Sequence, residues 1–71
     1  MPKADLRKVL AANVRYYRAG IGLSQEELAR RAGLDRSYVS GIERGVRNPT
    51  LLTMQRLANV LKVSLLDLLG A

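Results

Sequence analysis

Two short helical segments joined by about three residues constrain this chain more than any other feature of its sequence. Ser24 has the side chain of a helix N-cap, and Glu27 follows three residues later, which is the spacing of a capping box. Gly33 suits the left-handed conformation that ends a helix, and Asp35 is the next N-cap candidate. Such a short connection makes the two helices cross steeply, so small residues are needed where they meet. Ala29 and Gly33 provide them.

Helical patterns cover the rest of the chain as well. Apolar residues spaced by 4, 4 and 3 positions line one face of a helix that runs to about residue 19: Leu6, Leu10, Val14 and Tyr17. Thr50 is the N-cap candidate for a helix over 51–61. Ser64 and Asp67 have a second capping-box spacing and open a last short helix over 65–69. Because no long segment alternates with period two, we predict an all-α fold of five helices.

Composition restricts the function to classes that need neither cysteine nor histidine. Both residue types are absent, which removes disulfides, zinc sites and the usual general base, so we expect no enzyme, no metal and no cofactor. Twelve Lys and Arg against six Asp and Glu give a net charge of +6, and the expected partner is an anion. The longest apolar run, Val9–Ala12, is far shorter than the roughly 18 residues of a membrane span. Residues 1–3 do not open a signal peptide, so we expect a cytoplasmic protein without a membrane partner.

A series of short motifs, in one order and at one spacing, gives the strongest functional signal. The motifs are Gly22–Ala29, Ala32–Leu34, Tyr38–Ser40, Ile42–Gly45, Arg47–Thr50 and Leu57–Ala58. The series resembles the phage-repressor and Cro (C1-like, XRE-type) helix-turn-helix family of DNA-binding domains, over about Leu10 to Leu69. The resemblance implies one compact, lambda-repressor-like domain over 1–71, with its helix-turn-helix core at about 24–44. It also implies double-stranded DNA as the partner and a nucleoid-associated place in a bacterial or phage-type system.

In such a domain the third helix lies in the major groove and its first residues reach base edges. Here those residues are Arg36, Ser37, Ser40 and Gly41. Arg36 can bond guanine O6 and N7 together, although a solvated arginine at a helix N-terminus is the alternative. Gly41 departs from the family, because related repressors often carry a base-reading side chain there. Either specificity rests on fewer residues or the backbone approaches the groove closely. The cost of about 0.5–1 kcal/mol for glycine within a helix favours the close approach.

The resemblance also implies contacts to the DNA backbone. Gln25 occupies the position from which relatives donate to a phosphate, with an ordinary exposed glutamine as the alternative. Arg44, Arg47 and Asn48 flank the end of the third helix and would meet the backbone on the other side. Each of them alone is more often a simple surface residue. Tyr38 either contacts sugar and phosphate or packs on the helix surface.

An acidic residue on a DNA-facing helix calls for a partner inside the protein. Glu43 is such a residue, and in the family the matching glutamate pairs with an arginine near the end of the first helix, where Arg18 stands here. The resemblance therefore implies a structural ion pair. The remaining cations are expected to be solvated: Arg7, Lys8, Arg15, Arg30, Arg31, Arg56 and Lys62.

Apolar residues in excess of the core indicate a second copy of the chain as partner. The core of the last two helices is expected to use Leu51, Met54, Leu57, Leu61, Val63, Leu65 and Leu68. Leu52, Val60 and Leu66 are left over at positions where relatives often carry polar residues. We expect them to form the interface of a symmetric homodimer that reads a near-palindromic operator. Scattered surface apolar residues, which are common, are the alternative.

The sequence thus predicts a specific transcriptional regulator, most simply a dimeric repressor or a controller-type regulator of a restriction–modification system. One alternative is an antitoxin whose DNA binding is autoregulatory. Such proteins usually need extra chain to hold the toxin, and only two residues follow the last predicted helix here. Another alternative is the DNA-binding domain of a longer regulator. A helical enzyme is disfavoured, because no paired carboxylates accompany the missing histidine and cysteine.

Overall fold

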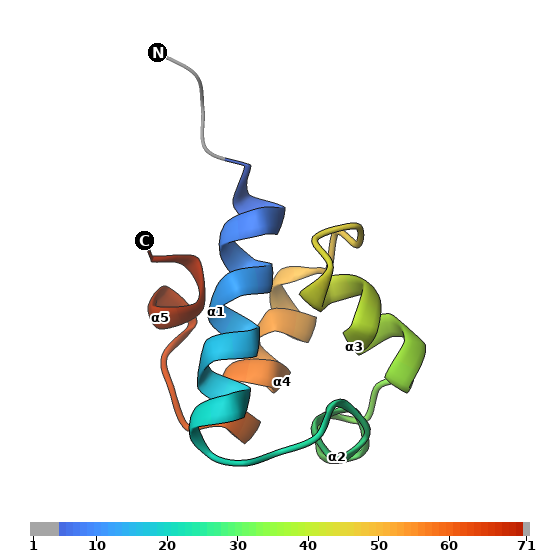
Figure 1. Cartoon of the computed structure of the whole chain (residues 1–71). Helices are drawn as coiled ribbons and strands as arrows, with labels where there is room; N and C mark the ends of the chain where they lie inside the picture. Colours follow the sequence, from blue (N-terminus) through green and yellow to red (C-terminus); the bar gives the residue numbers. More distant parts are fainter. Residues whose placement is uncertain (1–4, 71) are drawn as a thin grey trace.

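A computed structural model describes residues 5–70, and within that range the chain forms five α-helices and no strand. The helices are α1 (Leu6–Gly20), α2 (Gln25–Ala32), α3 (Arg36–Glu43), α4 (Leu51–Leu61) and α5 (Leu65–Leu69). The predicted all-α architecture is confirmed. Figure 1 shows α1 in the middle of the molecule, with α5 on one side, α3 on the other, α4 behind it and α2 below α3. The shortest helix, α5, packs against α1 and α4.

Hydroxyl side chains begin three of the helices as the sequence predicts. Ser24 Oγ accepts from the Glu27 backbone N–H at 3.0 Å, and Thr50 Oγ1 accepts from the Thr53 N–H at 3.1 Å. Ser64 and Asp67 form a complete capping box, with backbone-to-side-chain distances of 3.0 and 2.9 Å. Each cap satisfies a backbone N–H that has no partner within its own helix.

Two cap predictions were wrong in detail. The capping box at Ser24 is only half formed, because the Glu27 carboxylate accepts from Arg30 Nε at 2.8 Å instead of returning to the cap. Asp35 holds the cap position of α3, but among the described residues its side chain makes no capping hydrogen bond. Side-chain spacing alone therefore identified where these helices begin but not which partner each carboxylate takes.

Four helices end with the same backbone turn, in which one residue adopts a left-handed conformation. Gly22, Gly33 and Gly45 have φ values of +71°, +71° and +74°, and Lys62 takes the same place after α4 with φ +61°. The next residue's N–H then bonds five positions back, as from Leu34 to Ala29 at 2.8 Å. This pattern is the Schellman motif, which satisfies carbonyls left free at a helix end. It also reverses the chain within a few residues and so sets the crossing of α2 and α3.

The hydrophobic core lies between the five helices. Its largest fully buried side chains are Val14, Leu28, Val39, Ile42, Leu57, Leu61 and Leu68. Leu6 and Leu51, which the periodicity assigned to buried faces, are exposed in the first turns of α1 and α4. Leu6 borders an open hollow that Leu10, Met54 and Leu69 also line, so it is only partly covered. No helix over residues 5–70 is long and apolar enough to cross a membrane.

Asn13 fastens the end of α5 to α1. Its side-chain N–H groups donate to the Leu68 carbonyl at 2.8 Å and to the Gly70 carbonyl at 2.7 Å. A five-residue helix gains little stability from its own hydrogen bonds, so these bonds and the buried Leu68 side chain hold α5 in place.

Candidate nucleic-acid interface

The outer face of α3 is positioned by its inner face. Val39 and Ile42 are fully buried against the core, and the turn at Gly33 brings α2 across behind the helix. This arrangement leaves Arg36 and Ser37, in the first turn of α3, exposed to solvent. The predicted first base-reading positions therefore lie at an open helix N-terminus on a rigid support.

The other two predicted base-reading residues lie differently. Ser40 is half-buried, one turn after Arg36. Gly41 is buried, because the side chain of Arg47 covers it. The predicted approach of the Gly41 backbone to a DNA groove stays a prediction, and in this structure the Arg47 side chain occupies the space in front of Gly41.

The Glu43 carboxylate is buried, with 3% of the residue exposed, and is fully paired. Arg18 approaches it in a two-pronged geometry, with Nε 2.6 Å from Oε2 and Nη2 2.9 Å from Oε1. The third guanidinium nitrogen of Arg18, Nη1, donates to the Leu23 carbonyl at 2.7 Å. These bonds to Glu43 raise the pKa of Arg18 above its ordinary value, since they favour the charged guanidinium. The pair holds the end of α3 against α1.

Two further residues take part in this network, and sequence reasoning assigned them other roles. Gln25 Nε2 donates to Glu43 Oε1 at 3.1 Å, so part of the side chain predicted to contact phosphate is engaged inside the protein. Arg15 donates from Nη1 to the Glu43 backbone carbonyl, although it was predicted to be merely solvated. The signal for Arg15 was its place three residues before Arg18, on the same face of α1.

The residues predicted to meet the DNA backbone surround the end of α3. Arg44, Arg47 and Asn48 are exposed in the segment between α3 and α4. Tyr38 is half-buried and packs on the core, and the Arg47 guanidinium carbon lies 5.5 Å from its ring centroid. Tyr38 thus packs on the helix surface, which was one of its two predicted alternatives.

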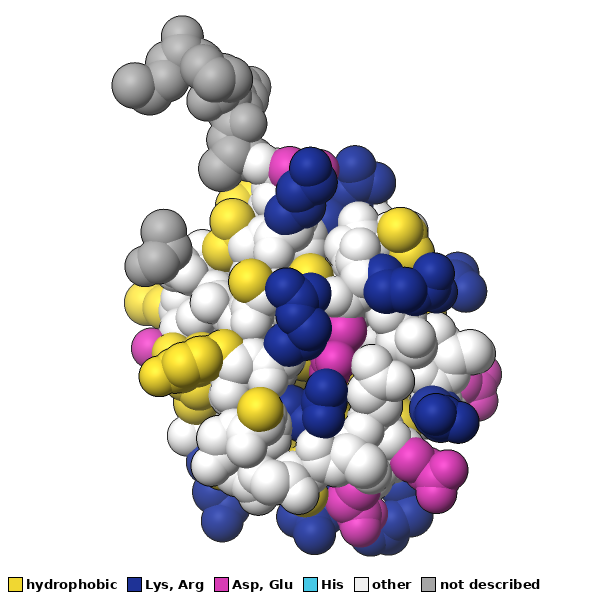
Figure 2. Space-filling view, in the orientation of Figure 1, with side chains coloured by type: hydrophobic (Ala, Val, Ile, Leu, Met, Phe, Trp, Pro, Cys, Tyr) yellow, Lys and Arg dark blue, Asp and Glu magenta, His cyan; other side chains and the backbone are white. Residues whose placement is uncertain are grey.

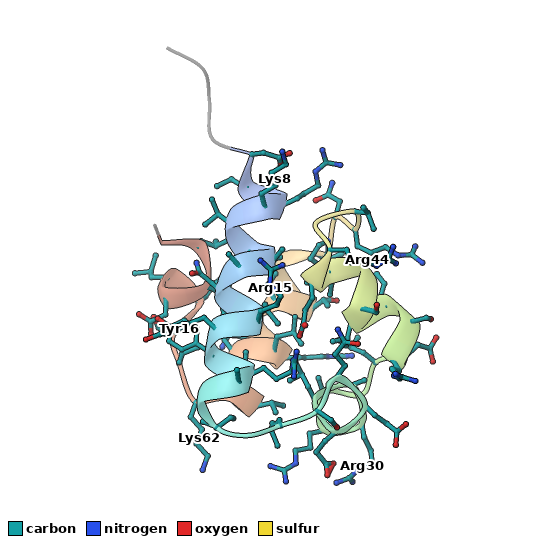
Figure 3. The ribbon with its side chains drawn as sticks, viewed as in Figure 1. Lys8, Arg15, Tyr16, Arg30, Arg44 and Lys62 are labelled. Atoms are coloured by element: carbon teal, nitrogen blue, oxygen red, sulfur yellow. The ribbon has the colours of Figure 1, made fainter. Side chains whose placement is uncertain are left out.

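Lysine and arginine side chains are spread over the face of the molecule seen in Figure 2, and more of them lie along its lower edge. Figure 2 shows them over α1 and around α3 and the segment after it. Figure 3, in the same view, labels Lys8 and Arg15 on α1 and Arg44 at the end of α3. A surface hollow of about 450 Å³ on the α2–α3 side is lined by Arg18, Ser24, Gln25, Glu26 and Arg36. The N-terminus of α2 adds its positive end to this hollow, which favours an anion.

The three residues predicted to form a dimer interface do not share one environment. Val60 is half-buried and packs against the core, so it has less free surface to offer a partner than the other two. Leu66 and Leu52 are 81% and 77% exposed, the former on α5 and the latter in the first turn of α4. Leu66 shares a shallow hollow with Tyr16 and Tyr17 of α1, and Figure 3 shows Tyr16 on the α5 side. Tyr16, itself 72% exposed, is an interface candidate that the sequence did not suggest.

A family model described as helix-turn-helix matches residues 14–68, which include α2, α3 and nearly all of α5. The chain belongs to the helix-turn-helix family. This is a family of DNA-binding transcriptional regulators, not of enzymes. The predicted recognition of the family, from motifs over about Leu10 to Leu69, is confirmed.

Similar helix-turn-helix proteins include regulators with known structures. A hypothetical transcription factor of Neisseria meningitidis is 51% identical over 65 residues, which make up 92% of this chain and 61% of that protein. The chain thus spans less than two thirds of that relative. The restriction–modification controller protein C.AhdI of Aeromonas hydrophila is 44% identical with a TM-score of 0.84, covering 87% of this chain and 94% of its own. SinR, a master regulator for biofilm formation solved in complex with DNA, is 37% identical with a TM-score of 0.82. The match covers 86% of this chain and 98% of the SinR chain.

Proposed function

We propose that this chain is a sequence-specific regulator of transcription that inserts α3 into the major groove of DNA as a symmetric homodimer. In this proposal residues 1–71 act as one domain with a helix-turn-helix core at about 24–44, working in the cytoplasm on the nucleoid. The observation that carries it is the exposed N-terminus of α3, where Arg36 and Ser37 project from a helix whose opposite face is buried. Membership of a family of DNA-binding regulators supports the same assignment.

Base reading falls to the first turns of α3. Arg36 presents a planar fork that matches the O6 and N7 acceptors of guanine in the major groove. Ser37 and Ser40 can donate to or accept from any base, so they add less discrimination. Specificity therefore rests on few side chains, and Arg36 is the main one.

Contacts to phosphate position α3 but carry no sequence information. Gln25 remains suited to this role, because its amide nitrogen carries a second N–H besides the one that donates to Glu43, and the backbone N–H groups of α2 lie beside it. Arg44, Arg47 and Asn48 would bind the backbone on the other side of the groove. Arg18 and Glu43 bind each other rather than DNA, and their ion pair holds α3 rigidly against α1.

The surface around Leu66 and Tyr16 is the proposed dimer interface. Both side chains are largely exposed in the monomer, on neighbouring elements that pack together. A second copy would remove this apolar surface from water, and it would add stability to a small domain without disulfides. A two-fold dimer presents its two α3 helices about one turn of DNA apart, which predicts a near-palindromic operator.

A controller-type regulator of a restriction–modification system is the more specific form of this proposal, and the similarity to C.AhdI supports it. A domain of a longer regulator is the second candidate. It is favoured by the Neisseria relative, of which this chain covers 61%.

Selection from random DNA duplexes tests the proposed function. We expect the purified protein to enrich one motif with two symmetric halves, whose centres lie about 10 base pairs apart. Binding should also weaken with salt, by about 0.9 in log K per log unit of salt for each phosphate contacted. A protein that shows the salt dependence but enriches no motif is only a basic protein, and this result would exclude a specific regulator.

Leu66→Glu tests the proposed interface. A symmetric interface would bring the two new carboxylates together in an apolar setting, so we expect the dimer dissociation constant to rise at least about tenfold. Sedimentation equilibrium over a range of concentrations measures it. Leu52→Glu is the matched control, since Leu52 is equally exposed but lies on α4. If Leu52→Glu dissociates the dimer and Leu66→Glu does not, the interface lies elsewhere.

A further inference from the structure

Gly41 lies on the outer ridge of α3 and is nevertheless buried. Ser37 and Arg44, both exposed, belong to the same ridge because they are four residues before it and three after it. A Cβ atom added to Gly41 would lie 2.6 Å from Cγ, 3.0 Å from Nε and 3.3 Å from Cδ of Arg47. The stem of Arg47 therefore occupies the space that a side chain at position 41 would fill.

The end of α3 brings Arg47 to this place. Gly45 is in the left-handed conformation with φ +74°, and the Val46 N–H donates to the Gly41 carbonyl at 3.0 Å. The chain thus folds back over α3, and the side chain of Arg47, the residue after Val46, begins beside Gly41. The Arg47 guanidinium then extends over the ring of Tyr38, 5.5 Å from its centroid, in the range of a cation–π contact. Two residues of α3 therefore position the Arg47 side chain: Gly41 contacts its aliphatic part, and Tyr38 contacts its guanidinium.

We propose that Gly41 is a positioning residue, which lets Arg47 lie across α3 and present its guanidinium to a DNA phosphate at a fixed point beside the recognition helix. The inference rests on the function proposed above and assigns Gly41 a role in DNA binding. A long side chain held at two points has less freedom to lose on binding. Gly41 has no side chain to read a base, but it thereby contributes to recognition of the DNA backbone through Arg47, which lies outside α3.

Gly41→Ala and Arg47→Ala, alone and together, test this coupling. We measure the dissociation constant for the duplex that the wild-type protein selects, at several salt concentrations. Gly41→Ala is expected to weaken binding about tenfold and to reduce the salt slope by about one, as Arg47→Ala does, because each loses one phosphate contact. The double variant should bind no more weakly than either single variant. The selected motif should stay the same in all three, since phosphate contacts carry no sequence information.

Folding controls separate this effect from a structural one. Arg47 can turn into solvent and alanine favours helix, so the melting temperature of Gly41→Ala should not fall. In the Arg47→Ala background the conflict with the stem is absent, so the double variant folds even if the single variant does not. Gly20→Ala is the matched control, because a Cβ there meets nothing within 4 Å, and it should bind like the wild type.

Two results would overturn the inference. One is a Gly41→Ala variant that binds as tightly as the wild type. The other is an equal loss of affinity from Gly41→Ala in the Arg47→Ala background, which would show that the new methyl group meets the DNA itself. A wild-type protein without affinity for any duplex would instead refute the proposed function, and the inference with it.

Discussion

Glu43→Ala is expected to reduce the free energy of unfolding by about 3–5 kcal/mol, because it leaves the charge of Arg18 without its buried partner. The same change removes the acceptor of the Gln25 amide. For a domain of this size the loss corresponds to a fall in melting temperature of more than about 10 °C. Thermal unfolding followed by circular dichroism, at one fixed protein concentration, measures it.

Two companion variants show whether the buried pair is the cause. Glu26→Ala removes an exposed carboxylate from the first turn of α2 and should cost less than about 1 kcal/mol. Arg18→Met combined with Glu43→Leu removes both charges and should be more stable than Glu43→Ala alone. If Glu43→Ala melted within 2 to 3 °C of the wild type, a shift of roughly 0.5 kcal/mol, the carboxylate would have to reach solvent.

Arg36→Ala is expected to abolish the preference for one base pair in each half-site. The lost discrimination should be about 1–3 kcal/mol, since a bidentate contact between arginine and guanine has this magnitude. Repeating the selection with the variant identifies the base pair. Binding to duplexes that carry single substitutions there then measures the ratio of dissociation constants.

Charge and shape can be separated at the same position. Arg36→Lys keeps the positive charge but not the fork, so it should lose the same base preference while retaining most of the affinity for unrelated DNA. Arg56→Ala removes one exposed arginine from α4 and should leave the motif unchanged. Recovery of the wild-type motif with Arg36→Ala would remove Arg36 from the base-reading surface.

Features with a local cause could be predicted from the sequence. The hydroxyl of Ser64 and the carboxylate of Asp67 form their box within four residues, and Gly33 adopts the positive φ that the absence of a Cβ permits. These signals placed the helices to within about one residue of their observed bounds. Lys62 shows the limit of this reasoning, because a lysine in the left-handed position carries no such signal.

Features of the site that depend on contacts between distant residues could not be derived in this way. The Arg18–Glu43 pair joins positions 25 apart and was expected only because the chain resembles a known family. The position of Arg15 on the same face as Arg18 does not reveal that it bonds to the Glu43 carbonyl, and nothing in the sequence places the Arg47 side chain over Gly41. Both contacts depend on how the chain folds and packs, which brings residues that are separated in the sequence together.

Methylation interference shows whether α3 reads DNA from the major groove. The duplex selected by the protein is partially methylated with dimethyl sulfate, which modifies guanine N7 in the major groove and adenine N3 in the minor groove. We expect guanine N7 methylation to block binding at two symmetric clusters about one helical turn apart. Interference confined to adenine N3, or none at either groove, would contradict major-groove reading by α3.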